Sequence, residues 1–224
     1  VKDDNQVDYN LLKLEDADFK NSTFKCENNF FYCVREQEKM SKSKFNVVNP
    51  DEICDKYGAD TLRMYEMFLG PIEQSKPWDT RGISGVHSFL KKFWGLFFKD
   101  GLINVSEEDP SNKSLKSLHK TIKKITEDIE KLSLNTCISS FMICINELSS
   151  MSCNNRLILE DLLILISPFA PHFAEEIWSQ LGHKESIVDQ VYPEYEEKYL
   201  VETEKLYPVS FNGKTKFTIN LPLD

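Results

Sequence analysis

The chain has 224 residues, 41% of them hydrophobic and 12% aromatic, with a formal net charge of −9. This composition can form one sizeable core or two modest ones, and its acidity argues against nonspecific nucleic-acid binding. The longest apolar run, residues 162–166, is far shorter than the roughly 20 residues of a membrane span, so we expect a soluble chain without membrane contact. The first residues are acidic (Asp3, Asp4 and Asp8) rather than basic and apolar, so we expect no signal peptide. We also expect the protein to be cytoplasmic and monomeric.

Residues 1–38 contain short apolar runs separated by polar residues, a pattern typical of strands. The runs at 23–26 and 30–34 flank an Asn-containing turn and predict a β-hairpin. We therefore expect a β-rich N-terminal segment. Its last strand should lead directly into the next motif.

The next motif, residues 39–43, contains lysines and serines but no acid, and a further lysine, Lys44, follows it. Five specified residues occur in a row by chance about once in a few million positions at average residue usage. Ammonium and hydroxyl groups on a mobile loop suit a polyphosphate, because they can neutralise phosphate oxygens as charge develops on them. The alternative is an ordinary solvated loop. We call this segment the lysine loop; it consists of Lys39, Met40, Ser41, Lys42 and Ser43.

Two short helices are predicted directly after the lysine loop. Asn49 and Pro50 form a helix start, with a capping side chain and a proline at the first helical position, and Gly58 follows its end. Asp60 can cap a second helix, which ends at Gly70. We expect the two helices to anchor the lysine loop.

The rest of the chain is predicted to be mainly helical. Residues 71–82 contain prolines and a glycine and form a connector, after which apolar residues recur at helical spacing. Helices with short links pack as an antiparallel bundle. The tail holds an acidic stretch and then a hairpin of residues 207–211 and 214–219 with an Asn-Gly turn. The expected bundle helices span residues 84–99, 114–132, 135–150, 156–166 and 171–182.

The six cysteines and four histidines predict neither a disulfide framework nor a metal site. The sequence contains no Cys-x-x-Cys and no His-x-x-x-His, the short spacings that paired ligands need. Cys137 and Cys144 lie in an apolar helical stretch, so we expect them to be small core residues.

Several distinctive motifs accompany the lysine loop, at residues 46–50, 57–63, 67–71, 77–78, 82–86, 167–172 and 175–178. Together with the loop, which is similar to the Lys-Met-Ser-Lys-Ser signature, they resemble the bacterial-type leucyl-tRNA synthetases among class I aminoacyl-tRNA synthetases. The match covers residues 39–182. Less closely, residues 1–38 resemble the end of the strand-rich leucine-specific insertion of this family, and residues 206–221 the first hairpin of its C-terminal domain.

The resemblance implies a mainly α fold, an antiparallel bundle that serves as anticodon-binding domain, between a β-rich segment and a β-hairpin. It divides the chain into residues 1–38 (end of the insertion), 39–70 (lysine loop and anchoring helices), 71–182 (tRNA-binding helical domain) and 183–224 (linker and start of a C-terminal domain). The full-length family members activate leucine with ATP and Mg²⁺ and transfer it to tRNA(Leu).

The resemblance also implies roles for the lysine loop, residues 39–43, as an ATP-binding segment. Lys42 would be the principal contact of the ATP phosphates, and Lys39 would assist. The chain has no His-x-Gly-His motif, nucleotide-binding fold or editing domain. We therefore expect the chain by itself to bind no cofactor and to be inactive.

The helix expected at 114–132 has a lysine-rich side opposite its apolar residues, at about 100° per residue. We interpret this side as a surface that follows tRNA phosphates. The alternative is an ordinary solvated helix face, since acids follow further along the helix. The candidate tRNA-binding residues are Lys113, Lys116, Lys120, Lys123 and Lys124.

Two other functions fit the same sequence. The chain could belong to a synthetase for another aliphatic amino acid, because such enzymes share the Gly-Ala-Asp segment at residues 58–60. It could also be a noncatalytic helical module that binds RNA or protein. In the second case, neutralising Lys42 should leave ATP–pyrophosphate exchange unchanged.

Overall fold

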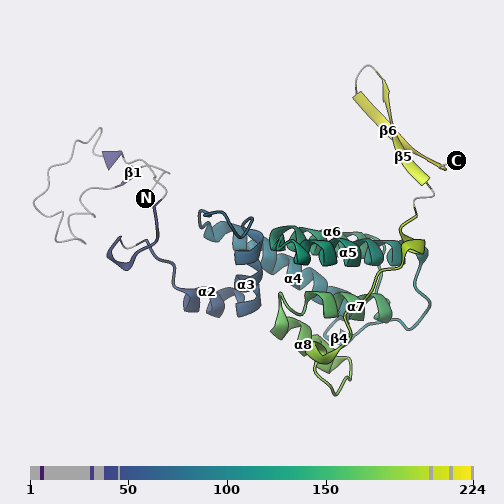
Figure 1. Cartoon of the computed structure of the whole chain (residues 1–224), viewed down its shortest axis with the longest axis horizontal. Coiled ribbons are helices and arrows are strands. Elements are labelled where there is room, and N and C mark those ends of the chain that lie inside the picture. The colour runs from purple at the N-terminus through teal and green to yellow at the C-terminus, as the bar shows by residue number, and fades with distance from the viewer. Residues whose placement is uncertain are drawn as a thin grey trace, which may run out of the picture. The chain divides into compact units, whose positions relative to one another are not determined.

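The computed structural model describes residues 6–7, 31–32, 38–44, 46–201, 204–211 and 214–222. The chain divides into two compact units, residues 1–48 and residues 49–224. As predicted, the described part is mainly α-helical, and its strands form two-stranded antiparallel pairs (Figure 1). Not one of the described helices combines the length and the apolar character needed to cross a bilayer.

In the first unit, strand β1 (Gln6–Val7) pairs antiparallel with strand β2 (Phe31–Tyr32). The strand predicted at 30–34 is therefore present in part, but its described partner is Gln6–Val7. The partner predicted at 23–26 and the Asn-containing turn lie outside the described residues. A short 3₁₀ turn, η2 (Lys42–Lys44), ends the lysine loop.

The second unit begins with helices α2 (Pro50–Tyr57) and α3 (Ala59–Phe68). The predicted start of α2 is confirmed, because Asn49 Oδ1 accepts a hydrogen bond of 3.1 Å from the Asp51 amide and Pro50 is the first helical residue. Gly58 joins the two helices at φ 88°, a region that glycine enters without steric cost. The prediction that Asp60 caps α3 is wrong, because α3 has already begun at Ala59.

The buried carboxylate of Asp60 instead contacts the start of helix α8 (Pro171–Gln180). Its Oδ2 accepts a 2.6 Å hydrogen bond from the Phe173 amide, and Oδ1 lies 2.9 Å from His172 Nδ1. A carboxylate at a helix N-terminus satisfies an amide that has no partner within the helix and interacts favourably with the helix dipole. This contact joins α3 to α8 across 113 positions of the chain.

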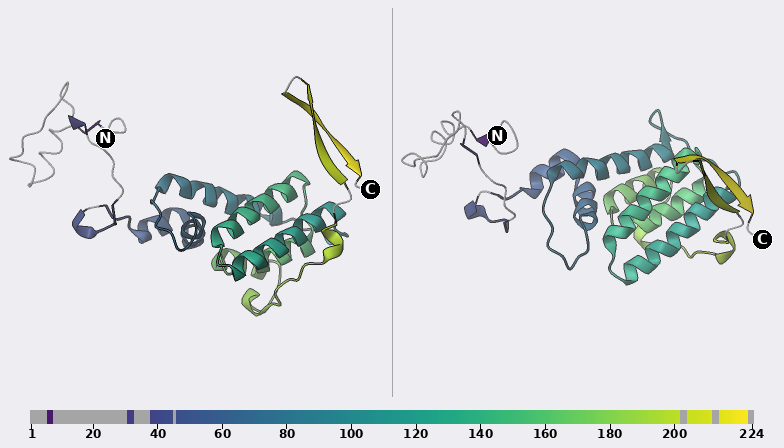
Figure 2. Two further views of the ribbon diagram at one scale, coloured as in Figure 1. Left: turned by 45° about the horizontal axis from the view of Figure 1, so that its top comes forward. Right: turned by 90° about the horizontal axis from the view of Figure 1, so that it is seen from above.

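The bundle consists of α4 (Ile83–Phe97), α5 (Asn112–Glu130), α6 (Leu134–Ser150), α7 (Arg156–Ile166) and α8. Helices α5 and α6 lie side by side, α7 packs against α5 and α8, and α3 packs against α4 and α6 (Figures 1 and 2). The predicted burial of Cys137 and Cys144 is confirmed. Large side chains without solvent exposure fill the core, among them Met64, Phe93, Phe97, Leu118, Ile122 and Phe141.

Three predicted ends of bundle helices lie two residues beyond the observed ones. One of them is that of α8, which ends at Gln180 instead of residue 182. Helix α4 ends at Phe97, because β3 (Phe98–Lys99) turns back through Gly101 at φ 77° to pair with β4 (Leu102–Ile103). Helix α5 ends at Glu130, and Leu132, expected in its apolar stripe, is 60% exposed at φ 55°. Local turns therefore stop α4 and α5 before their apolar pattern does.

The chain after the bundle contains short 3₁₀ turns and a hairpin. The turns are η4 (Ile187–Asp189) and η5 (Glu197–Tyr199), and a further turn, η3 (Thr80–Gly82), precedes α4. The predicted hairpin is present, with β5 (Glu204–Phe211) antiparallel to β6 (Lys214–Pro222). Its Asn-Gly turn lies outside the described residues.

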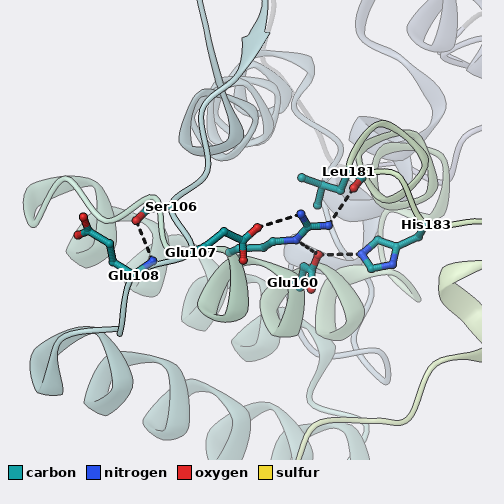
Figure 3. A network of polar contacts seen from close by, with 7 residues as sticks. Ser106, Glu107, Glu108, Glu160, Leu181 and His183 are labelled. Carbon is teal, nitrogen blue, oxygen red and sulfur yellow. Dashed lines mark hydrogen bonds and ion pairs between the residues drawn. The ribbon is translucent and has the colours of Figure 1, made fainter.

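A polar network around Arg156 holds the C-terminal end of α8 against the start of α7 (Figure 3). The Arg156 guanidinium donates to Glu160 at 2.8 Å, to Glu107 at 3.1 Å and to the Leu181 carbonyl at 2.8 Å. Glu160 also shares a 2.7 Å hydrogen bond with His183 Nε2. The guanidinium fork thus ties three separate segments together.

We predict that the free energy of unfolding depends on pH because of one carboxyl group on α7, that of Asp161. Burial, with a smaller contribution from Glu160, raises the pKa of Asp161 from 3.8 to about 6. The folded chain then binds this proton more tightly than the unfolded chain, so stability falls as pH rises from 3.8 to about 6 and stays lower above it. We expect Asp161→Asn to raise the unfolding free energy at neutral pH by about 1–2 kcal/mol.

The increase in unfolding free energy caused by Asp161→Asn should vanish below the unfolded-state pKa of 3.8. At such a pH the Asp161 carboxyl is protonated, and so uncharged, in both the folded and the unfolded chain. Urea unfolding at neutral pH and at the lowest pH where the chain stays folded measures this difference. An equal effect of the substitution at both pH values would contradict the assignment.

Candidate nucleotide-binding loop and basic helix face

Hydrogen bonds among residues 39–46 hold the lysine loop in shape. The Ser41 amide donates to Asn46 Oδ1 at 2.8 Å, and the Lys44 amide donates to the Ser41 carbonyl at 3.0 Å. The Ser41 and Ser43 hydroxyls lie 2.7 Å apart and bond to each other. The backbone at Ser41 is therefore fixed from both sides.

The lysines of this segment differ in their partners. Lys39 and Lys42 are exposed, and within the described part of the chain neither forms an ion pair. Lys44 instead contacts Glu38 at 2.7 Å, with about half of each side chain exposed. Two ammonium groups of the lysine loop are thus available to an anion, whereas the third lysine is partly neutralised.

This arrangement can stabilise a polyphosphate. Flexible lysine side chains act as compact point charges that can follow phosphate oxygens, and the hydroxyls of Ser41 and Ser43 can exchange their mutual hydrogen bond for one to a ligand. In the structure Lys39, Met40, Lys42 and Ser43 of this segment are exposed and Ser41 is half-buried, and Lys42 and Ser43 lie in the turn η2.

The lysines of α5 fall into two groups. Lys113 and Lys120 are exposed, Lys116 is half-buried, and none of the three has an ion pair within the described residues. Lys123 contacts Glu197 at 3.0 Å, and Lys124 contacts the buried carboxylate of Asp128 at 2.6 Å. Among the residues that the structure describes, the lysines of this helix side without an ion pair lie in its N-terminal half. We call these three residues the basic face: Lys113, Lys116 and Lys120.

Residues 195–199 of the acidic tail pack against α5, which the sequence analysis missed. The Tyr199 ring stacks on the buried His119 ring with centroids 4.5 Å apart, and the Glu196 amide donates to His119 Nδ1 at 3.2 Å. Burial lowers the pKa of His119 in spite of the nearby Glu196 carboxylate, which favours the neutral imidazole that accepts this bond. The spacing of 77 positions between the partners left no local sequence signal.

A buried acid at the junction of α5 and α6 was also missed. Asp128 Oδ2 accepts a 2.6 Å hydrogen bond from Thr136 Oγ1, while its carbonyl accepts the Ser133 amide at 2.8 Å. Its spacing of four from Lys124 is the signal that could have identified the ion pair. Asp128 therefore fixes the turn between two helices rather than taking part in chemistry.

A pocket of about 460 Å³ lies between the α2–α3 junction, α4 and α8, lined among others by Tyr57, His87, Trp94 and His172. A search of the described residues finds no group of three or more His, Cys, Asp or Glu side chains placed to hold a metal ion. The surface of the pocket is therefore mainly apolar and aromatic, and the described residues form no cluster of metal ligands there.

Two parts of the chain match known protein families. Residues 112–224 match the family described as "Anticodon-binding domain of tRNA ligase", and residues 29–79 match "tRNA synthetases class I (I, L, M and V)". The chain belongs to the family of anticodon-binding domains of tRNA ligases. Its lysine loop lies in the part that matches the class I synthetases.

The similar curated proteins are leucine–tRNA ligases. The enzyme of Flavobacterium psychrophilum is 61% identical over 98% of the chain, and that of Christiangramia forsetii is 58% identical over 100% of it. In both cases the chain spans 23% of the relative's own length.

A solved structure is similar as well. It is a LeuRS of Agrobacterium radiobacter in a ternary complex with tRNA and LeuAMS, at a TM-score of 0.64 and 27% identity. The match covers 83% of the chain described here and 26% of the LeuRS chain. The predicted resemblance to leucyl-tRNA synthetases is therefore confirmed.

Proposed function

We propose that this chain is part of a leucine–tRNA ligase, an enzyme that activates leucine with ATP and then transfers it to tRNA(Leu). The observation that carries the proposal is the lysine loop, with Lys39 and Lys42 exposed and unpaired in the described part of the chain. The relatives named leucine–tRNA ligase, which match along almost the whole chain, support it. The chain supplies two parts of that enzyme and not the complete catalytic site.

In the activation step, a carboxylate oxygen of leucine attacks the α-phosphorus of ATP, and the bond from that phosphorus to the bridging oxygen breaks. The electron pair leaves with pyrophosphate, so negative charge grows on the leaving oxygens. Lys42, assisted by Lys39, neutralises this charge, an interaction that is stronger in the transition state than in bound ATP. Mg²⁺ enters with ATP and neutralises the same phosphates in the complete enzyme.

The second part is the helical domain, which we propose binds tRNA through the basic face of α5. Lysines at helical spacing that are exposed, as Lys113 and Lys120 are, or half-buried, as Lys116 is, can follow a line of phosphates, and their binding releases counterions. Lys123 and Lys124 lie on the same side, but Glu197 and Asp128 already hold them. Residues 1–38, 39–70, 71–182 and 183–224 remain the four functional parts that we propose for the chain.

The basic face gives a test in the complete enzyme. Replacing Lys113, Lys116 and Lys120 together by alanine should raise the KM for tRNA about tenfold and reduce its salt dependence, because up to about three phosphate contacts are lost. ATP–pyrophosphate exchange should not change. The matched control replaces three other exposed lysines, Lys99, Lys131 and Lys184. Equal effects of the two triple variants on the KM for tRNA would contradict the proposal that the basic face binds tRNA.

The amino acid specificity is tested by ATP–pyrophosphate exchange and tRNA charging with the complete enzyme. We expect both reactions with leucine, at a kcat/KM far above that for isoleucine or valine. Preference for another aliphatic amino acid would identify a different synthetase. Failure of the folded enzyme to catalyse exchange with any of them would favour a noncatalytic RNA- or protein-binding module.

A further inference from the structure

Asn46 is placed to act on the lysine loop from outside it. Its side-chain Oδ1 accepts the Ser41 amide at 2.8 Å, and its Nδ2 donates to the Lys39 carbonyl at 3.4 Å. One carboxamide thus contacts the backbone on both sides of Met40. Asn46 itself lies outside the pentapeptide.

This contact has the geometry of a strand neighbour. In a β-ladder, the carbonyl before a residue and the amide after it both pair with the adjacent strand. The asparagine carboxamide carries one acceptor and one donor group and can replace that strand. The two bonds therefore restrain the backbone on either side of Met40, between the two lysines that have no ion pair within the described residues.

The consequence falls on Lys39 and Lys42. The Lys39 carbonyl is held directly, and Lys42 follows Ser41, whose amide is held and whose carbonyl accepts the Lys44 amide. The main chain that carries both ammonium groups is thus fixed, while their side chains remain exposed. Catalytic groups that are held in place before the reaction act more effectively on a developing charge, because less reorganisation is needed.

We propose that Asn46 is a positioning residue for the reaction with ATP: its carboxamide sets the backbone from which Lys39 and Lys42 reach the phosphates. This inference rests on the proposed function of the lysine loop. Asn46 does not touch ATP in this account. It acts only through the two lysines.

Three variants of the complete enzyme separate the contributions. In Asn46→Ala both hydrogen bonds are lost. Asn46→Asp has almost the same shape and still accepts the Ser41 amide, but it cannot donate to the Lys39 carbonyl and adds a negative charge beside the lysines. The matched control is Asn49→Ala, which removes another exposed asparagine and one helix cap but leaves the lysine loop unchanged.

We expect Asn46→Ala to lower kcat of ATP–pyrophosphate exchange about tenfold, which corresponds to about 1.4 kcal/mol of lost transition-state stabilisation by the two lysines once their backbone is no longer held. The KM for ATP and the fraction of active sites in a burst experiment should stay at their normal values. Asn46→Asp should be at least as slow as Asn46→Ala, and Asn49→Ala should keep the normal kcat.

Lys42→Ala, measured in parallel, separates the proposed function of the lysine loop from the proposed positioning role of Asn46. Normal exchange by Lys42→Ala would overturn the proposed function. A large loss in Lys42→Ala with normal kcat in Asn46→Ala or Asn46→Asp would overturn only the positioning role. The same holds if Asn46→Ala only lowers the fraction of active sites, only raises the KM for ATP, or matches Asn49→Ala.

Discussion

Lys42→Ala should lower kcat for ATP–pyrophosphate exchange by the complete enzyme about 100- to 1000-fold, the usual effect of removing one group that stabilises developing charge. The KM for leucine should change little, because in the proposed role Lys42 contacts the phosphates and not the amino acid. Lys39→Ala should show a smaller loss of about tenfold, since Lys39 assists. The measurement is steady-state exchange of labelled pyrophosphate into ATP.

The matched control for this prediction is Lys44→Ala. Lys44 is a neighbouring exposed lysine, but its ammonium group contacts Glu38 at 2.7 Å. Exchange by Lys44→Ala should stay close to that of the unchanged enzyme. If all three lysine variants lost activity equally, only the total charge of the segment would matter, and the specific role of Lys42 would be wrong.

Asp60→Ala should lower the unfolding free energy of the chain by about 2–4 kcal/mol, because the Phe173 amide at the start of α8 loses its charged acceptor. The Asp60 carboxylate is 7% exposed and also contacts His172 Nδ1. Asp60→Asn keeps one acceptor oxygen but loses the charge, so its loss should be about half as large. Urea unfolding followed by circular dichroism measures both.

Asp55→Ala is the control for the Asp60 variants, since Asp55 is an exposed acid on α2 and its replacement should change stability by less than about 0.5 kcal/mol. His172→Ala should also be milder than Asp60→Ala, because the His172 side chain is 78% exposed. A loss in Asp60→Ala no larger than that in Asp55→Ala would show that the contact with α8 contributes nothing to stability.

The helices could be predicted from the sequence because their signals are local. Apolar residues at helical spacing, and Asn49 with Pro50 at the start of α2, act within a few residues of the chain. The contacts that assemble the unit were not predictable in this way. Asp60 looked like a local cap, but its partner lies 113 positions further along the chain.

The candidate site shows the same division. The lysine loop could be proposed as a phosphate-binding segment from the sequence alone, because the groups that suit a phosphate lie in five adjacent residues. On helix α5, Lys123 contacts Glu197 from the tail, 74 positions away, an ion pair that no local sequence pattern predicts. The bridge made by Asn46 depends on a turn that folds residue 46 back onto residues 39 and 41, and no periodic pattern encodes such a turn.

The central claim is that the ammonium group of Lys42 acts on the ATP phosphates during activation. Single-turnover kinetics of the complete enzyme test it most directly, with adenylate formation and the transfer of leucine from preformed adenylate to tRNA measured separately. For Lys42→Ala we predict slow adenylate formation and a normal rate of leucine transfer to tRNA. Normal adenylate formation by the folded variant, or an equal loss in both steps, would contradict it.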